Sequence, residues 1–152
     1  MTGLNHGLTG AVIAIAINQP ALAVPLAFVS HFAQDAIPHW DYGVKPGDQF
    51  FSRRFNLFLI GDFCLALFAM AFIFGAFPDQ YKLIWACMIA AAAPDLMWGY
   101  HYLYQQKIKG RQVKLDWLAR LHAAIEWSES PPGAIIEFLW IIAFGVLILA
   151  LR

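Results

Sequence analysis

The chain has 152 residues, of which 61% are hydrophobic and 13% are charged, and its formal net charge is zero. Soluble proteins carry about 25% charged residues, and a water-soluble domain of this length has too small a core to bury so much apolar surface. We therefore predict a single membrane-embedded helical domain over residues 1–152, and the neutral charge balance excludes a nucleic-acid partner bound through bulk charge.

The first apolar stretch is interrupted at Asn18-Gln19-Pro20. Proline has no amide hydrogen and disfavours helix at the residue before it, so this tripeptide predicts a turn between helices at 7–18 and 21–37. Each helix is shorter than the ~20 residues that a membrane span needs. We expect a hairpin, re-entrant or packed inside the protein, that brings His6 to the same leaflet as His31.

Four further helices are expected, of which Pro78 closes the first and Pro94 bends the second. Apolar residues recur at helical spacing over the third, while Lys114 and Arg120 face elsewhere, as in an amphipathic helix at a membrane interface. The expected ranges are 55–77, 80–104, 113–128 and 134–151. The predicted fold class is an all-α membrane bundle with a short N-terminal hairpin, about three further membrane helices and one amphipathic interfacial helix.

The basic residues are unevenly divided between the two ends of this bundle. Lys82 and Arg152 fall at one end, and the other eight fall at the end that also carries the N-terminus. By the positive-inside rule, the crowded end faces the cytoplasm of a bacterial or archaeal-type inner membrane. The eight residues are Lys45, Arg53, Arg54, Lys107, Lys109, Arg111, Lys114 and Arg120.

Imidazole and carboxylate side chains gather at the same end. A carboxylate inside a span costs about 2.5–3.5 kcal/mol, so it needs a cation, a partner or water. Taken one at a time, such residues also fit capping or interfacial roles, but their number at one face favours a metal site. Zinc chooses mixed imidazole and carboxylate ligands, and we expect two or three divalent ions. The candidate ligands are His6, His31, Asp35, His39, Asp62, Asp95, His101, His122 and Glu126.

Two N-terminal segments carry a family resemblance. The chain opens with Asn5-His6-Gly7-Leu8-Thr9-Gly10, and its apolar hairpin ends in Ser30-His31-Phe32-Ala33-Gln34-Asp35-Ala36-Ile37-Pro38-His39-Trp40-Asp41. Over these residues the chain resembles the membrane-bound metal-dependent hydrolases of the YdjM type, in which a histidine opens the first helix and an Asp-rich loop closes the second. The later His-Arg and Thr-His-Ser stretch of that family is absent here.

The order of candidate ligands is also similar to that of zinc-dependent phospholipase C and the P1-type nucleases. Those all-helical enzymes use an early His, a His-x-x-x-Asp helix, a further His, an additional Asp and a His-x-x-x-Glu helix. The resemblance assigns these roles to His6, His31 with Asp35, His39, Asp62, and His122 with Glu126, although Asp62 here follows the His-x-x-x-Asp pair. It implies hydrolysis of a phosphoester by metal-activated water.

Individual roles follow from position and chemistry. Asp35 lies between His31 and His39 in the sequence, and we expect it to bridge two metal ions. Asp62 or Asp95 is expected to act either as a further ligand or as the general base, and these alternatives stay open.

The expected substrate is a phospholipid, an isoprenoid phosphate or another amphiphilic ester. Arg53 and Arg54 precede the third helix, where they either bind an anionic headgroup bidentately or serve as positive-inside anchors. Asp41 is expected to orient a ligating histidine. The oligomeric state is left open.

Two other functions compete with a hydrolase. A metal or proton carrier would use the same cluster without catalysis, but the apolar stretches 63–77 and 83–93 contain no strongly polar residue that would continue a path. A carboxylate-bridged di-iron oxidoreductase usually carries Glu-x-x-His on two helices, and this chain has no such motif. A cluster that ends within the membrane favours a site over a pathway.

Overall fold

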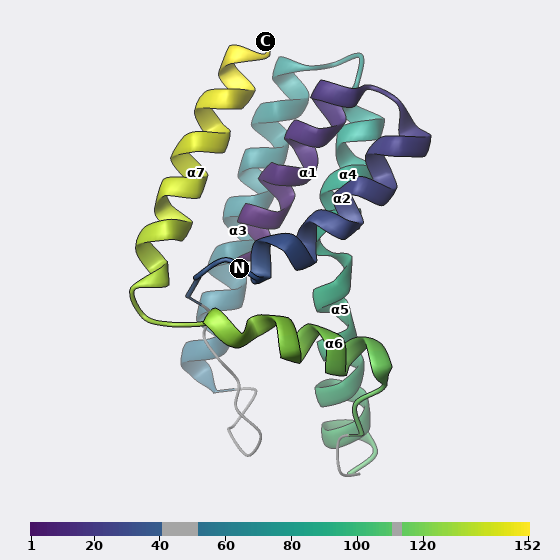
Figure 1. Cartoon of the computed structure of the whole chain (residues 1–152), viewed down its shortest axis with the longest axis vertical. Coiled ribbons are helices and arrows are strands. Elements are labelled where there is room, and N and C mark those ends of the chain that lie inside the picture. Colours follow the sequence, from purple (N-terminus) through teal and green to yellow (C-terminus); the bar gives the residue numbers. More distant parts are fainter. Residues whose placement is uncertain (41–51, 111–113) are drawn as a thin grey trace.

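The computed structural model describes residues 1–40, 52–110 and 114–152, without the side chains of residues 106 and 107. Within these ranges the chain is helical and contains no strand, which confirms the predicted fold class (Figure 1). The elements are α1 (Gly3–Ile17), α2 (Pro20–Asp35), α3 (Arg53–Ala76), α4 (Tyr81–Ala92), η1 (Ala93–Asp95), α5 (Leu96–Trp98), η2 (Gly99–Ile108), α6 (Trp117–Ile125), η3 (Glu126–Ser128) and α7 (Gly133–Ala150).

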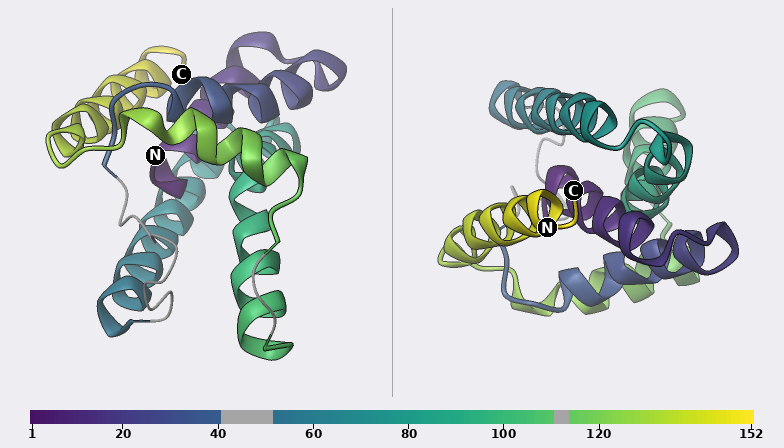
Figure 2. Two further views of the ribbon diagram at one scale, coloured as in Figure 1. Left: turned by 60° about the horizontal axis from the view of Figure 1, so that its bottom comes forward. Right: turned by 90° about the horizontal axis from the view of Figure 1, so that it is seen from above.

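The short helix α1 lies in the middle of the bundle, between α2, α3, α4 and α7 (Figure 2). It is buried over most of its length, as expected for a helix whose apolar residues are spread around its whole circumference. Its packing against α4 is close, because a Cβ atom on Gly10 would lie 2.4 Å from the carbonyl oxygen of Cys87. Protein therefore surrounds α1 where lipid surrounds a typical membrane span.

The predicted hairpin is confirmed. Asn18 ends α1 with a φ of 47°, in the left-handed region that asparagine tolerates better than most residues. Pro20 then opens α2, a position where its missing amide hydrogen is harmless. α1 begins earlier than the predicted residue 7, because Thr2 caps it by accepting a hydrogen bond from the Asn5 amide on its side chain.

Among the residues that the structure describes, three helical stretches are long and apolar enough to cross a membrane: Arg53–Ala76, Tyr81–Gln105 and Gly133–Ala150. The most apolar 18-residue window of the first is only 6% buried within the protein. Large apolar side chains cover its outer face, and Phe68, for example, is 75% exposed. Surfaces of this kind are stable only against lipid, so the structure supports the predicted integral membrane protein.

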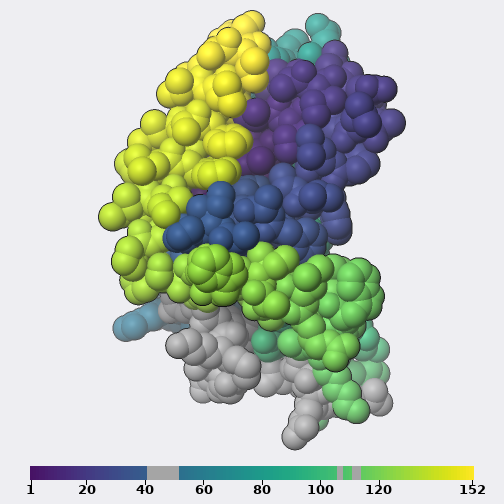
Figure 3. All heavy atoms as spheres, in the orientation of Figure 1, coloured from purple at the N-terminus to yellow at the C-terminus, as the bar shows by residue number. Residues whose placement is uncertain are grey.

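The second span changes geometry at Pro94, as predicted. α4 ends at Ala92, a short 3-10 turn carries Pro94, and the helix continues through α5 into the π-helical segment η2. The amphipathic helix is shorter than the predicted 113–128, because Asp116 caps α6 by accepting a hydrogen bond from the Ala119 amide at 2.9 Å. α6 lies across one end of the bundle, against the C-terminal end of α2 (Figure 1, Figure 3).

A candidate metal centre

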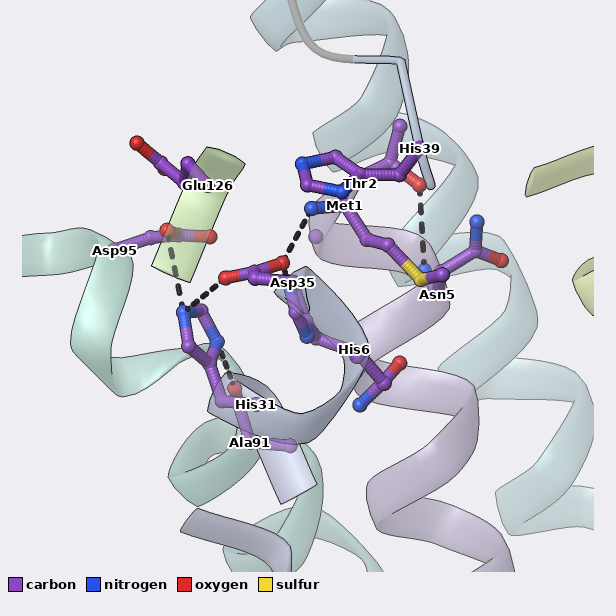
Figure 4. Close-up of polar contacts among 12 residues, drawn as sticks. Met1, Thr2, Asn5, His6, His31, Asp35, His39, Ala91, Asp95 and Glu126 are labelled. Carbon is purple, nitrogen blue, oxygen red and sulfur yellow. Dashed lines mark hydrogen bonds and ion pairs between the residues drawn. The ribbon is translucent and has the colours of Figure 1, made fainter. Parts of the chain in front are cut away.

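Four of the predicted ligands converge where α2, η1 and α6 meet. His31 and Asp35 come from the last turns of α2, Asp95 from the turn that Pro94 initiates, and His122 from α6. One ligand atom from each residue lies within 4.8 Å of the corresponding atoms of the other three. The hairpin, the proline turn and the crossing of α6 are therefore all needed to assemble the group. Figure 4 shows three of its members, His31, Asp35 and Asp95, facing one another.

The spacing of the ligand atoms suits a single small ion. The two Nε2 atoms of His31 and His122 are 3.2 Å apart, and Asp35 Oδ2 lies 3.0 Å from the first and 2.9 Å from the second. Ligands around a tetrahedral zinc ion, with Zn–N bonds of about 2.0–2.1 Å, are about 3.3 Å from one another. Asp95 Oδ1 lies 3.6 Å and 3.8 Å from the same two nitrogens, where a fourth ligand is expected.

The ring of His31 is oriented by the backbone of the neighbouring span. Its Nδ1 lies 2.7 Å from the carbonyl oxygen of Ala91, which only accepts, so Nδ1 carries the hydrogen. In this tautomer the lone pair of Nε2 faces the centre, as a metal ligand requires. Pro94 brings no amide hydrogen to this part of the helix, and the same turn points Asp95 toward His31.

Asp35 lies at the centre of the cluster and is almost completely buried. Burial opposes its ionisation, but the hydrogen bond with His122 and the nearby imidazoles of His31 and His6 outweigh burial and hold the pKa of this carboxyl group far below its usual range. Its Oδ1 atom lies 3.2 Å from His6 Nε2 and 2.5 Å from the α-amino nitrogen of Met1. The ionised form suits a carboxylate that binds a cation.

One side of the group is accessible. The side chain of Asp95 is 39% exposed and that of Glu126 is 26% exposed, whereas His31, Asp35 and His122 are buried. Glu126 Oε1 lies 3.4 Å from His122 Nε2, one helical turn along from it. The two carboxylates therefore lie on the outer side of the group, and the imidazoles hold the inner positions.

Two further histidines predicted as ligands lie close by but outside the four-residue group. The ring of His6 stacks on that of His31, with their centroids 4.0 Å apart. His39 is buried with its Nδ1 2.8 Å from the Ile37 carbonyl oxygen, and its Nε2 has no hydrogen-bond partner among the described residues. No second group of three ligand atoms is brought within bonding range of one ion in those ranges.

The structure places Asp62 and His101 elsewhere than predicted. Asp62 accepts hydrogen bonds from backbone amides at the start of α1, so its charge is satisfied by the helix terminus. His101 Nε2 lies 3.4 Å from Asp116 Oδ2, and its Nδ1 accepts a hydrogen bond from Gln105 at 3.1 Å. Neither residue belongs to the four-residue group, because tertiary partners that sequence spacing does not reveal hold them away from it.

The remaining predicted residues are placed as follows. Arg53 and Arg54 are exposed in the first turn of α3, and no anion-binding contact tests their expected role. Asp41 lies outside the described residues. Sequence reasoning assigned no role to Glu137 or Asn5, which are buried and hydrogen-bonded to each other at 3.0 Å. The sequence does contain a signal for Glu137: it is a carboxylate inside an otherwise apolar span. A carboxylate in that position is costly in lipid unless it has a partner.

Comparisons of the chain with protein families, with curated proteins and with solved structures find no match. The resemblance to the YdjM-type hydrolases and to zinc-dependent phospholipase C therefore stays a prediction from the residues. Over the described residues, the structure establishes a helical bundle with three apolar helices of spanning length and one largely buried His/Asp group that could hold a metal ion.

Proposed function

We propose that this protein is a membrane-embedded metal-dependent hydrolase that acts on a phosphoester of a lipid or another amphiphile. The observation that carries the proposal is the group formed by His31, Asp35, Asp95 and His122, which combines closely spaced ligand atoms with one accessible side. Structural zinc sites are closed by four protein ligands, whereas catalytic sites keep a position for water or substrate. Asp95, the most loosely placed of the four, lies where such a position would open.

The roles of the residues follow from their burial. A bound divalent ion supplies a water molecule of lowered pKa and an electrostatic partner for phosphoryl oxygens. His31, His122 and Asp35 Oδ2 hold that ion from the buried side. Asp95 and Glu126 line the accessible side, where either carboxylate can accept the proton of the attacking water. Zinc is the ion that this donor set fits best, and further ions bound through His6 and His39 remain part of the proposal.

The position of the centre suits a substrate with an apolar tail. Trp117 and Trp127, at the two ends of the α6–η3 segment, are 70% and 76% exposed, as residues of an interfacial aromatic belt are. Arg53 and Arg54 would meet an anionic headgroup at the same level.

The excess of basic residues at this end supports a cytoplasmic orientation for the centre. Cysteine labelling checks the orientation in a background that lacks both native cysteines. An impermeant maleimide added to intact cells should label Asp79→Cys in the α3–α4 turn, and it should reach Trp127→Cys only after permeabilisation. The reverse pattern would invert the topology.

A specific observation argues against the carrier alternative. The buried polar contacts that lead away from the centre along α1 end at Thr9, which bonds Gln34 at 3.0 Å and Trp140 at 3.0 Å. Beyond Thr9, residues 10–17 of α1 are glycine, alanine, valine and isoleucine. A path for ions or protons needs polar groups through the second half of the membrane, and α1 provides none.

The proposal is tested with a panel of phosphoesters that differ in tail and headgroup. Purified protein loaded with zinc is incubated with each compound, and released phosphate or headgroup is measured for wild type, Asp35→Asn and Asp79→Asn. Asp79 provides the matched control, because it is an exposed aspartate in the α3–α4 turn, far from the centre. We expect hydrolysis of at least one amphiphilic ester that Asp35→Asn lowers at least ~100-fold and Asp79→Asn leaves unchanged. Equal rates for wild type and Asp35→Asn would end the catalytic proposal.

A further inference from the structure

The first turn of α1 lies between two carboxylates that come from different membrane spans. Asp62 projects from α3 and Glu137 from α7, and both reach the backbone that immediately precedes His6. Neither belongs to the four-residue metal group. Both carboxylates therefore hold the same turn of α1.

Asp62 accepts two hydrogen bonds from consecutive backbone amides. Its Oδ2 atom lies 2.9 Å from the Gly3 nitrogen, and its Oδ1 atom lies 3.1 Å from the Leu4 nitrogen. The fit depends on the missing side chain of Gly3, because a Cβ atom there would be 2.8 Å from Asp62 Oδ2. Both oxygens of this carboxylate are therefore directed at the helix terminus.

Glu137 completes the set from the opposite side. Its Oε2 atom accepts hydrogen bonds from the side-chain amide of Asn5 at 3.0 Å and from the backbone amide of Thr2 at 3.3 Å. The Asn5 side chain also donates to the backbone carbonyl of Glu137, at 3.3 Å. α7 is thereby tied to the same turn of α1 that Asp62 ties to α3.

The physical need for these contacts is strong. The first amides of a helix have no partner within the helix, and an unsatisfied amide away from water costs several kcal/mol. The positive end of the helix dipole also favours negative charge there. Two carboxylates in apolar spans thus offset their own burial by satisfying donors that lipid cannot satisfy.

The same turn carries the residue that contacts the metal group. His6 follows directly after Asn5, and its ring both stacks on His31 and places Nε2 3.2 Å from Asp35 Oδ1. A shift of the first turn of α1 would move this ring against two members of the centre.

We propose that Asp62 and Glu137 are positioning residues: by holding the first turn of α1 they fix His6, which in turn fixes Asp35 and His31 for binding the metal. The inference rests on the metal centre proposed above. It replaces the expected roles of Asp62 as a ligand or general base.

Three variants test it: Asp62→Asn, Glu137→Gln, and Gly3→Ala, which disturbs the Asp62 contact without altering any carboxylate. Gly75→Ala in α3 is the matched control, because nothing lies within 4 Å of a Cβ atom there. Zinc affinity and stoichiometry are measured by chelator competition on folded protein in detergent. We expect affinity to fall by about 10–100-fold in the three variants with the number of bound ions unchanged.

A double variant separates a shared contact from general destabilisation. If Gly3 and Asp62 act together, adding Gly3→Ala to Asp62→Asn should cause little further loss of affinity. Loss of one bound ion in Asp62→Asn or Glu137→Gln would overturn the positioning role, because it would show that the altered residue is a ligand. Unchanged zinc affinity in both variants would overturn it as well.

Hydrogen exchange on metal-free protein distinguishes failure of this inference from failure of the metal centre. The amides of Gly3 and Leu4 should exchange faster in Asp62→Asn than in Gly75→Ala. Unchanged exchange contradicts the positioning role directly, whether or not the wild type binds metal. Faster exchange in Asp62→Asn, combined with a wild-type protein that binds no zinc, would support the role of Asp62 in holding the first turn of α1 and would reject only the metal centre.

Discussion

Asp35 is the residue around which the centre is arranged. Oδ2 faces His31 and His122, and Oδ1 faces His6, so one carboxylate links three helices through three imidazoles. The His31–Asp35 spacing on one helix face is readable in the sequence, because residues four apart lie one above the other. The sequence also names His122 as a candidate ligand, but which of the candidates it joins depends on where α6 crosses α2.

The protonation state of His122 predicts how metal binding depends on pH. Burial alone would lower the pKa of His122, but the hydrogen bond to Asp35 and the charges of Glu126 and Asp95 together raise it above its usual value. A raised pKa means that protons compete for Nε2 already near neutral pH, and metal binding must release them. We expect zinc affinity to rise with pH through the neutral range and then level off.

Isothermal titration of zinc in buffers of different ionisation enthalpy measures this proton release. Proton release should be largest at the acid end of the series, where His122 is protonated before zinc binds. An affinity independent of pH between about 5.5 and 8 would contradict a centre built on histidine, whose ordinary pKa is about 6.5.

At the scale of the elements, local signals in the sequence place the turns well. Asn18 and Pro20 mark the hairpin and Pro94 marks the change in the second span, since proline acts through its own covalent structure. The helix bounds were predicted less well. α1 begins at Gly3 because its cap comes partly from Asp62, a residue distant in the sequence.

Close packing of α1 against α4 gives a prediction about stability. A Cβ atom on Gly10 would lie 2.4 Å and 2.7 Å from the backbone oxygen and carbon of Cys87, and backbone cannot move aside as a side chain can. We expect Gly10→Ala to lower the free energy of unfolding in detergent by about 1–3 kcal/mol, the usual cost of overpacking.

The control for this packing is Gly145→Ala in α7, where an added Cβ meets nothing within 4 Å. Alanine favours helix over glycine by about 1 kcal/mol, so this change should be neutral or stabilising. Equal thermal stability of the two variants would show that the α1–α4 contact is less close than described.

At the scale of the whole molecule, the composition predicts the membrane bundle, and the gathering of imidazoles and carboxylates at one end predicts where the site lies. The membership of the site could not be predicted in full. Asp62 and His101 lie at the right level, but each is bound to a different partner: the α1 terminus for Asp62 and Asp116 for His101. The position of a residue along its helix predicts its depth in the membrane. Whether its side chain joins the metal ligands depends on how that helix is rotated about its own axis.

The central claim is that one buried group of two histidines and two aspartates binds a divalent metal ion. Elemental analysis of purified, zinc-supplemented protein tests it most directly, with His31→Ala and the equally buried His101→Ala as the compared variants. We predict at least one tightly held zinc ion per chain in wild type and in His101→Ala, and its loss in His31→Ala. A folded wild-type protein that retains no metal, or a His31→Ala protein that retains all of it, would contradict the account.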